Sequence, residues 1–377
     1  MDFTLDEATL DIAGLARDIA SKVSTDERVA ELEAAGRMDD VLWRELGAAG
    51  LLALELSADA VDVGDGLSIV ESVTVAEQLG RALARVPFGT HAVAALPVLA
   101  KTGSSTLRES LLAAAATGKK ILTVAFEEEL GADVRAPQAT LSRNDSRWVL
   151  SGTKVNVPYA AESAAILVNA VSDDGVRVVA VASTAPGVGI TDTPVTGKTP
   201  TFIVDFDSVV IDDDHVLAGG GDTVAEVADR MTLAVCADQS GTVSRAMELT
   251  ASYAVEREQF GRAIGSFQAV AQRLADGYID AQGLSLTTTQ AAWLFARADD
   301  LDDGDDVGMA IATAKFWACD AGHRVAHTAV HVHGGVGLDT THPAHRYFLR
   351  AKQNEFTMGS APVVLESIGA GLASAPA

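Results

Sequence analysis

The chain has 377 residues, with 28 Lys and Arg against 52 Asp and Glu, so its formal net charge at pH 7 is −24. This balance argues against binding to nucleic acid or to an anionic membrane surface, because both partners require a basic protein face. With 48% hydrophobic and 21% charged residues, the composition is that of a globular protein rather than a disordered one.

The cysteine content and the N-terminal sequence both predict a cytoplasmic location. Cys236 and Cys319 are the only cysteines, too few for a disulfide framework, so a reducing compartment is expected. The chain begins with the acidic sequence MDFTLDE, which lacks the apolar stretch of a signal peptide. We also expect no membrane helix, because no apolar run approaches the roughly 20 residues that such a helix needs.

The first part of the chain, residues 1–118, is predicted to form a helical domain. It is rich in Ala, Leu, Glu and Arg, and its apolar residues recur with helical spacing. Two such series are Val41, Leu42, Leu46 and Ala49, and Leu107, Leu111, Leu112 and Ala115.

The middle part, residues 119–222, is predicted to form a β domain. Short β-branched runs are separated there by turn clusters at 144–146, 151–152 and 173–175. Strands at this spacing without intervening helices favour an antiparallel sheet or barrel. The predicted strands are 121–125, 148–150, 165–168, 176–181 and 201–206.

The last part, residues 223–377, is predicted to be helical again. The first helix should cover about 223–257, and the third should run from the acidic stretch 302–306 to Gly334 and Gly335. Pro343 should open a fourth helix at a first-turn position. The predicted architecture is therefore α+β: an N-terminal helical domain, a middle antiparallel β domain and a C-terminal four-helix domain.

The second helix of this last part is predicted to begin with Ser266 as its N-cap. Its apolar residues recur so that they share one helix face. These residues are Phe267, Val270, Leu274, Tyr278 and Ala281.

The common nucleotide-binding and hydrolase motifs are missing from the sequence. It contains no GxGxxG, GxxxxGK[ST], GxSxG or HExxH pattern. A nucleotide cofactor would therefore not be held by a Rossmann or P-loop device.

Histidines are concentrated near the C-terminus. Six of the eight lie between positions 323 and 345, and His323, His327 and His331 repeat every four residues on one helix face. This spacing suits a metal site, but no Cys or carboxylate lies in an obvious ligand register, so we assign no metal. Packed or hydrogen-bonded histidines are the favoured interpretation, and contact of one or two with a cofactor is the alternative.

Residues 253–268 and 332–337 are two further candidate segments. In the first, Arg257 ends a helix, where it either complements the helix dipole or pairs with a phosphate as a fork donor. In the phosphate interpretation, Phe260 flanks a planar ring and the next helix start adds free N–H groups. In the second segment, Gly334 and Gly335 either cap a helix or let the backbone approach a ligand closely.

Four segments together resemble the acyl-CoA dehydrogenase family. Residues 256–268 (EREQFGRAIGSFQ), followed by RLAD at 273–276, are similar to one family signature. HVHGGVG at 331–337, followed by Pro343 and Arg346, is similar to a second. WVLSGTK at 148–154 and FDSVVI at 206–211 resemble two more, and the resemblance covers roughly residues 4 to 370.

The resemblance implies a tetrameric enzyme that holds FAD non-covalently and desaturates an acyl-CoA thioester. In this family a Glu removes a proton from the α carbon, and the flavin N5 takes a hydride from the β carbon. The ADP half of FAD reaches residues of a neighbouring subunit, and at His331 the family more often has Gln. The matching positions here are Arg257, Gln259, Phe260, Ile264, Gln268, His331, Gly334 and Gly335.

The sequence departs from the family pattern where the flavin ring and the base are expected. In the flavin loop at 126–133, Phe126 and Ala132 replace a Thr and a Ser. Residues 156–158 (NVP) replace Trp-Ile-Thr, and Pro158 offers neither a hydroxyl nor a backbone N–H.

The family's two possible base positions fall at Met358 and near Met231. A thioether accepts no α-proton, so we assign no catalytic residue to this chain. The pattern resembles the base-lacking subunit of the heteromeric dehydrogenases with which actinobacteria shorten the cholesterol side chain.

That resemblance implies an α2β2 heterotetramer in which a paralogous subunit carries the catalytic Glu. It also implies an acyl-CoA substrate, which would be a steroid, and electron-transfer flavoprotein as acceptor. Two alternatives stay open. One is a self-sufficient enzyme with a relocated base at Glu355, Glu248 or Glu127, and the other is a non-catalytic assembly subunit.

Overall fold

The computed structural model describes residues 3–61, 64–129, 133–144, 147–298 and 307–374. The chain divides into two compact units, each described below by itself. The helical unit comprises Met1–Glu31, Val73–Ala84 and Val235–Ala377, and the sheet unit comprises Leu32–Ser72 and Arg85–Ala234. The domain boundaries expected after residues 118 and 222 stay a prediction.

The region before residue 118 is helical, as predicted. Side chains cap three of its helices: Asp6 accepts from the N–H of Thr9, Asp39 from that of Leu42, and Ser104 from that of Leu107. A π-helix at Gly89–Ala95 leads directly into α5. The helices are α1 (Glu7–Val23), α2 (Asp26–Ala35), α3 (Asp40–Ala48), α4 (Ile69–Arg81), α5 (Leu96–Thr102) and α6 (Ser105–Ala116).

The middle region forms a seven-stranded sheet, with the order β1-β4-β2-β3-β7-β6 and β5 paired to β4. All five predicted strands are present, and β2 and β6 are additional. The antiparallel prediction is wrong for part of the sheet, because β4 pairs in parallel with β1 and with β2. The strands are β1 (Leu122–Ala125), β2 (Thr140–Asn144), β3 (Arg147–Pro158), β4 (Ala165–Ser172), β5 (Gly175–Ala182), β6 (Val188–Asp192) and β7 (Thr201–Ile211).

The predicted turn at Ser151 and Gly152 lies instead inside β3. Gly152 has φ of 144°, and the pairing of β3 with β7 shifts between Leu150 and Gly152. A Cβ at position 152 would lie 2.7 Å from the Cβ of Ala139. The glycine therefore marks a bulge and a close backbone approach, rather than a chain reversal.

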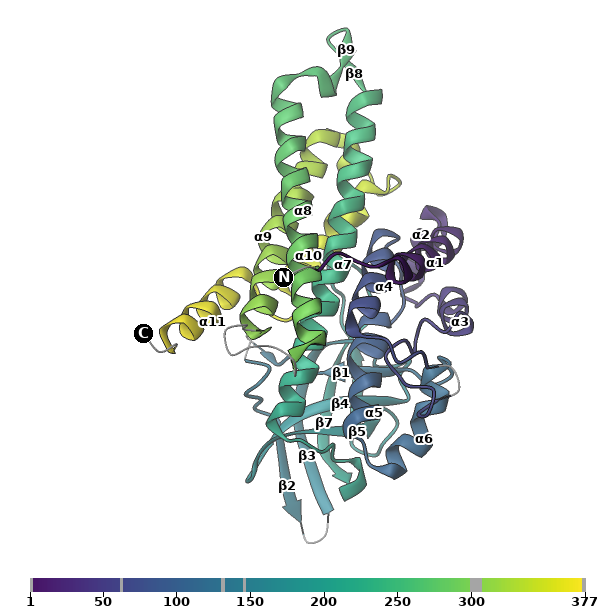
Figure 1. The fold of residues 1–377 in the computed structure, drawn as a ribbon, viewed down its shortest axis with the longest axis vertical. Coiled ribbons are helices and arrows are strands. Elements are labelled where there is room, and N and C mark those ends of the chain that lie inside the picture. The colour runs from purple at the N-terminus through teal and green to yellow at the C-terminus, as the bar shows by residue number, and fades with distance from the viewer. Residues whose placement is uncertain (1–2, 62–63, 130–132, 145–146, 299–306, 375–377) are drawn as a thin grey trace. The chain divides into compact units, whose positions relative to one another are not determined.

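The C-terminal region consists of long helices, as predicted. Helix α7 starts two residues before the predicted position, and α9 ends at His333, directly before Gly334 and Gly335 as expected. The acidic stretch 302–306 lies outside the described residues, and Pro343 is the N-cap of α10 rather than a first-turn residue. Figure 1 shows the small β8–β9 hairpin joining α7 and α8 at one end of these helices. The elements are α7 (Gly221–Glu256), β8 (Glu258–Gln259), β9 (Arg262–Ala263), α8 (Gln268–Ala296), α9 (Val307–His333), α10 (Ala344–Phe356) and α11 (Ala361–Ser374).

The start and the buried face of α8 differ from the prediction. Ser266 lies in a short 3₁₀ turn and donates its hydroxyl to the carbonyl of Ala263, so it caps no helix. The N-cap is Phe267, which makes no side-chain capping bond. Tyr278 is 61% exposed, whereas Ala281 and Leu284 are buried. The apolar residues of α8 thus form a broader band than the single buried face predicted.

Helices α4 and α7 cross in close backbone contact within the helical unit. A Cβ at Gly80 would collide with the backbone of Asp238, and a Cβ at Gly241 would collide with the carbonyl oxygen of Glu77. Both glycines therefore lie where only a residue without a side chain fits.

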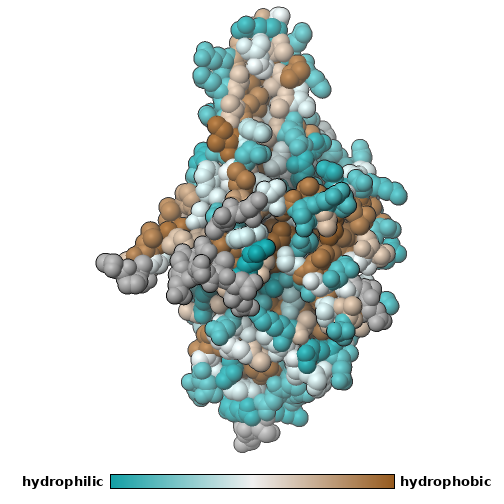
Figure 2. Space-filling model, in the orientation of Figure 1, coloured by the Kyte–Doolittle hydropathy of each residue, from teal (hydrophilic) through white to brown (hydrophobic). Residues whose placement is uncertain are grey.

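One segment of the described chain, Ala344–Ala373, has the length and composition of a possible membrane span. Its 18-residue window has a mean hydropathy of 1.2 and is 6% buried, so the expectation that no such run exists is wrong by this measure. The structure interrupts it, because Met358 and Gly359 have φ of 58° and 103° between α10 and α11. Figure 2 shows apolar surface on α11, where Val363, Leu365 and Leu372 are exposed.

Candidate functional site

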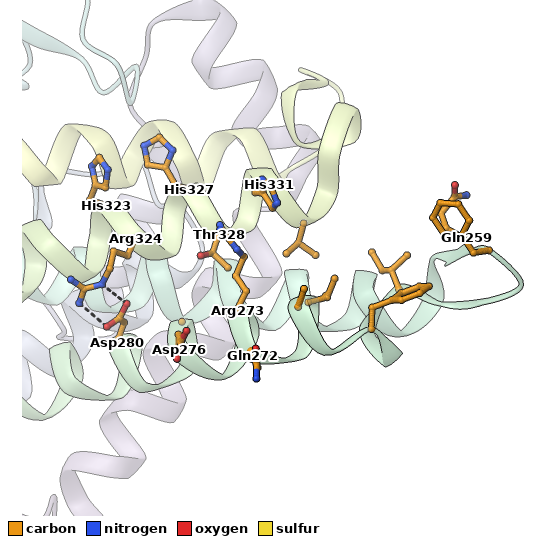
Figure 3. A pocket seen from close by; sticks show the side chains of 17 residues that line it. Gln259, Gln272, Arg273, Asp276, Asp280, His323, Arg324, His327, Thr328 and His331 are labelled. Atoms are coloured by element: carbon orange, nitrogen blue, oxygen red, sulfur yellow. Dashed lines mark hydrogen bonds and ion pairs between the residues drawn. The ribbon is translucent and has the colours of Figure 1, made fainter.

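A groove of about 870 Å³ lies in the helical unit, lined by residues of the β8–β9 hairpin, α8 and α9. Its size falls in the range that small-molecule and cofactor sites occupy. Figure 3 shows these side chains coming from the two helices and the hairpin. The lining residues are Gln259, Phe260, Ile264, Phe267, Ala269, Val270, Gln272, Arg273, Asp276, Gly277, Asp280, His323, Arg324, His327, Thr328, His331 and Val332.

Helical spacing explains why these residues meet. On α8, Ala269, Arg273, Asp276 and Asp280 follow one another at intervals of three or four and so share a face. On α9 the histidines at 323, 327 and 331 do the same. His331 was predicted from the sequence, but none of the polar α8 residues that line the groove was, although the same spacing was readable there.

The end of the groove nearest the hairpin is apolar. Phe260 at the hairpin tip is 92% exposed with φ of 55°, and it meets Phe267 edge-on with ring centroids 6.2 Å apart. The guanidinium of Arg262 lies 4.1 Å from the centre of the Phe267 ring. Together with Ile264 and Val270, these rings provide a surface on which a planar base can pack.

Two arginines line the polar part of the groove, and they differ in their partners. Arg324 donates to both oxygens of Asp280, at 2.8 and 2.7 Å, and also pairs with Asp320. Hydrogen bonds from Arg324 to these carboxylates raise its pKa. Within the part of the chain that the structure describes, no hydrogen bond or ion pair holds Arg273. Figure 3 shows Arg273 extending from α8 toward Thr328 and His331 on α9.

The three histidines of α9 have different surroundings. His323 lies 3.2 Å from a Glu355 oxygen, and its ring is 4.4 Å from that of His327. Burial and the nearby His323 and Lys352 lower the pKa of His327. Among the described residues, no three His, Cys, Asp or Glu side chains gather as metal ligands. His331, by contrast, makes no hydrogen bond with the described residues and faces the groove.

The structure brings together four of the eight predicted cofactor residues. Gln259, Phe260, Ile264 and His331 line the groove, whereas Arg257, Gln268, Gly334 and Gly335 do not.

Arg257 lies at the end of α7, where its N–H donates to Tyr253 and its carbonyl accepts from Ile264, both at 2.8 Å. Gln268 is the first residue of α8. Gly334 has φ of 60° directly after α9, as a C-cap glycine does.

In the sheet unit, the loop that the sequence matched to a flavin loop is tied to β3 by a buried ion pair. Lys154 donates to Glu128 at 2.7 Å and to Asn169 at 2.6 Å. Glu128 also accepts from the N–H groups of Gln138 and Ala139. Burial acts to raise the pKa of Glu128, but these hydrogen bonds outweigh it and lower the pKa.

The structure describes most of the residues that replace the family's flavin contacts. Phe126 is buried, Asn156 has φ of 53°, and its amide lies 3.4 Å from a Glu127 oxygen. Pro158 ends β3, and its carbonyl accepts from the Thr123 hydroxyl. Ala132 lies outside the described residues.

The two positions at which the family carries its base have no carboxylate. Met231 is 6% exposed on α7, and Met358 lies in the turn after α10 with φ of 58°.

The carboxylates weighed as replacements are all engaged. Glu355 pairs with Lys352 at 2.6 Å and with His323. Glu248 pairs with Arg81 and with Arg245. Burial acts to raise the pKa of Glu248, but hydrogen bonds from these arginines lower it. Such pairs fit structural carboxylates better than a base whose pKa is tuned to the working pH.

Comparison with known proteins establishes the family. The N-terminal, middle and C-terminal domain models of acyl-CoA dehydrogenases match residues 6–119, 123–209 and 219–373. The chain belongs to the acyl-CoA dehydrogenase family. It has that family's three-domain α+β fold, as the sequence predicted, and the cofactor of this enzyme family is FAD.

Two relatives that are similar over most of the chain come from Mycobacterium tuberculosis. The acyl-CoA dehydrogenase FadE27 is 44% identical over 382 residues, covering all of both chains. The acyl-CoA dehydrogenase FadE28 is 32% identical, covering 88% of this chain and 92% of that protein.

Two solved structures are similar over almost their whole length. A chain of the ChsE4–ChsE5 complex of M. tuberculosis matches with a TM-score of 0.93 and 43% identity, covering 100% of both chains. A chain of the Tcur3481–Tcur3483 steroid acyl-CoA dehydrogenase matches with a TM-score of 0.90 and 37% identity, covering 98% of this chain and 99% of that one.

Proposed function

We propose that this chain is the base-lacking subunit of a cytoplasmic, FAD-dependent heterotetramer that desaturates a steroid side-chain acyl-CoA. In this arrangement a paralogous subunit supplies the Glu that removes the α-proton, and electron-transfer flavoprotein accepts the electrons. The observation that carries the proposal is the pair of methionines, Met231 and Met358, at the two positions where the family places its base.

The engaged carboxylates support this division of labour. A general base must reach the proton that it removes, and its pKa must lie near the working pH. Glu355 and Glu248 are bound to cations within their own chain, and Glu127 contacts Asn156. A relocated base therefore has little support in the geometry.

The surface supports the expectation of a partner. Large exposed apolar side chains recur along the helical unit, including Ile279, Leu286, Leu338 and Leu372. A partner chain packed on these helices would cover such side chains. Two of the similar structures carry the names of two proteins, and one of these is described as a steroid acyl-CoA dehydrogenase.

The groove fits the ADP half of FAD. Its apolar end can pack against adenine, and its polar part offers a guanidinium and an imidazole to phosphates. FAD, when bound, supplies the acceptor for the hydride. The residues of this chain would hold the nucleotide tail through Gln259, Phe260, Ile264 and His331, with Arg257, Gln268, Gly334 and Gly335 at the margins.

The test is to purify this chain alone and together with a paralogue that carries the base. We expect steroid-CoA oxidation from the pair only, and we expect its loss when the paralogue's base Glu is replaced by Gln. Glu355→Gln in this chain should leave turnover unchanged, and it serves as the matched control. Oxidation of acyl-CoA by this chain alone would contradict the proposal. A pair that copurifies without flavin would instead favour the alternative that this chain is a non-catalytic assembly subunit.

A further inference from the structure

We propose that Arg273 is a phosphate-binding cation of the α8–α9 groove and pairs with the diphosphate of the bound nucleotide. The inference rests on the proposed function, because it takes the ADP half of FAD as the ligand. It goes beyond the family signature, in which Arg257 was the expected phosphate partner. The structure places Arg273, and not Arg257, among the residues that line the groove.

The availability of the two groove arginines distinguishes them. The guanidinium of Arg324 is saturated by Asp280 and Asp320, so a phosphate would have to displace two carboxylates to reach it. Arg273 has no such partner among the described residues. A planar guanidinium matches phosphate oxygens with two parallel hydrogen bonds, so a free arginine in a cavity suits an anion better than a neutralised one.

The neighbours of Arg273 across the groove are additional donors. Figure 3 shows its guanidinium end directed toward Thr328 and His331, which line the same cavity. The Thr328 hydroxyl and the His331 imidazole can each donate one hydrogen bond to a phosphate oxygen. The three side chains thus form a donor set that comes from both walls.

The position of Arg273 along α8 suits a nucleotide. Val270, at the apolar end, precedes Arg273 by three residues, which is about 4.5 Å along the helix axis. A base packed at the apolar end would leave Arg273 within reach of its phosphates. The arrangement accounts for an apolar surface and one available arginine among the described residues that line the groove.

Asp276 limits where the phosphates can lie. This carboxylate lines the groove one turn beyond Arg273, and no ion pair with the described residues neutralises it. A like charge at this distance repels an anion and confines it to the side of Arg273. Removing the carboxylate should therefore strengthen binding, which is the opposite of the effect expected at Arg273.

The test measures ADP binding by calorimetry, using the full chain alone and in the flavin-stripped complex with its paralogue. Arg273→Gln should weaken ADP binding about tenfold or more, the range expected for losing a charged hydrogen-bond donor. Arg273→Lys should weaken it less, and Asp276→Asn should strengthen it. Arg108→Gln, which removes an exposed arginine of α6, makes the same charge change and should leave the affinity unaltered.

The ligand series separates phosphate binding from base packing. Adenosine should bind wild type and Arg273→Gln with equal affinity, because it has no phosphate. Equal ADP affinity in the two proteins would overturn the role of Arg273. The same would follow if wild type bound no ADP, either as the chain alone or in the flavin-stripped complex.

The FAD content and turnover of the untreated complex report on the proposed function separately. A complex with FAD and full turnover, but with ADP affinity insensitive to position 273, would reject this inference alone. A complex that never carries FAD would reject the proposed function and this inference together.

Discussion

The buried polar groups of the sheet unit and the polar groups of the α8–α9 groove differ in how fully they are satisfied. In the sheet unit, Lys154, Glu128 and Asn169 hold one another in the interior, and each has partners at hydrogen-bonding distance. In the groove, Arg273 and His331 face an open cavity without partners among the described residues. Satisfied buried groups stabilise a fold, whereas available groups in a cavity are suited to a ligand.

Breaking the buried pair should have the largest effect on stability. Lys154→Met leaves the Glu128 carboxylate buried beside an apolar side chain, and we expect a loss of about 3–5 kcal/mol. Urea unfolding measures it.

Two variants control this experiment. Lys101→Met breaks the exposed pair with Glu226 and should cost less than about 1 kcal/mol. Adding Glu128→Gln to Lys154→Met should restore part of the loss. Equal losses in the two lysine variants would show that burial does not decide the outcome.

Acidification should destabilise the sheet unit through His91. This ring is fully buried, accepts from the N–H of Leu122 and lies 3.0 Å from the carbonyl oxygen of Ala115, and burial lowers its pKa to about 4. The unfolded chain binds the proton near pH 6.5, so stability is full above 6.5 and falls between 6.5 and about 4, by about 3 kcal/mol.

The pH dependence of the urea midpoint measures this contribution. His91→Gln, which does not titrate, should show a shallower decline than wild type between pH 6.5 and 4. Parallel curves for the two proteins would assign the decline to other groups.

Within the groove, Arg324 should matter for stability more than for binding. Arg324→Gln leaves the Asp280 side chain, 12% exposed, without its charged partner, and we expect a loss of about 1 kcal/mol. Thermal unfolding of the purified chain measures it. A gain in stability would mean that the ion pair costs more in desolvation than it returns.

The smallest effect on stability is expected at Arg273. Because Arg273 is exposed and pairs with no described residue, Arg273→Gln should change the free energy of unfolding by less than about 0.5 kcal/mol. A loss as large as that of Arg324→Gln would mean that Arg273 supports the fold and would remove the contrast between the two arginines. The same denaturation experiment compares them side by side.

Most of the helical architecture could be predicted, because periodic apolar residues define α7 and α9 almost to their ends. The strands β2 and β6 could not be predicted in the same way. Both are mostly exposed, with few apolar residues to mark a face. Gly152 was misread because a glycine at a bulge and a glycine in a turn have the same local sequence.

Only those groove residues that match cofactor positions of the family could be predicted from the sequence. The hairpin residues and His331 follow from short segments of sequence. Arg273 lies in the RLAD segment of the signature, but a binding role for it follows only once α8 is known to face α9. The pairing of Arg324 with Asp280 joins residues 44 positions apart, and no local pattern indicates it. Distinguishing a neutralised arginine from an available one therefore required the three-dimensional structure.

The crossing of α4 and α7 through Gly80 and Gly241 constrains how this chain can be re-engineered. Because each glycine admits the backbone of the other helix, neither helix can slide or rotate without a collision. A chimaera that takes one of these helices from a related protein would need both small positions in the same alignment. The two segments should thus be exchanged together, as a single module.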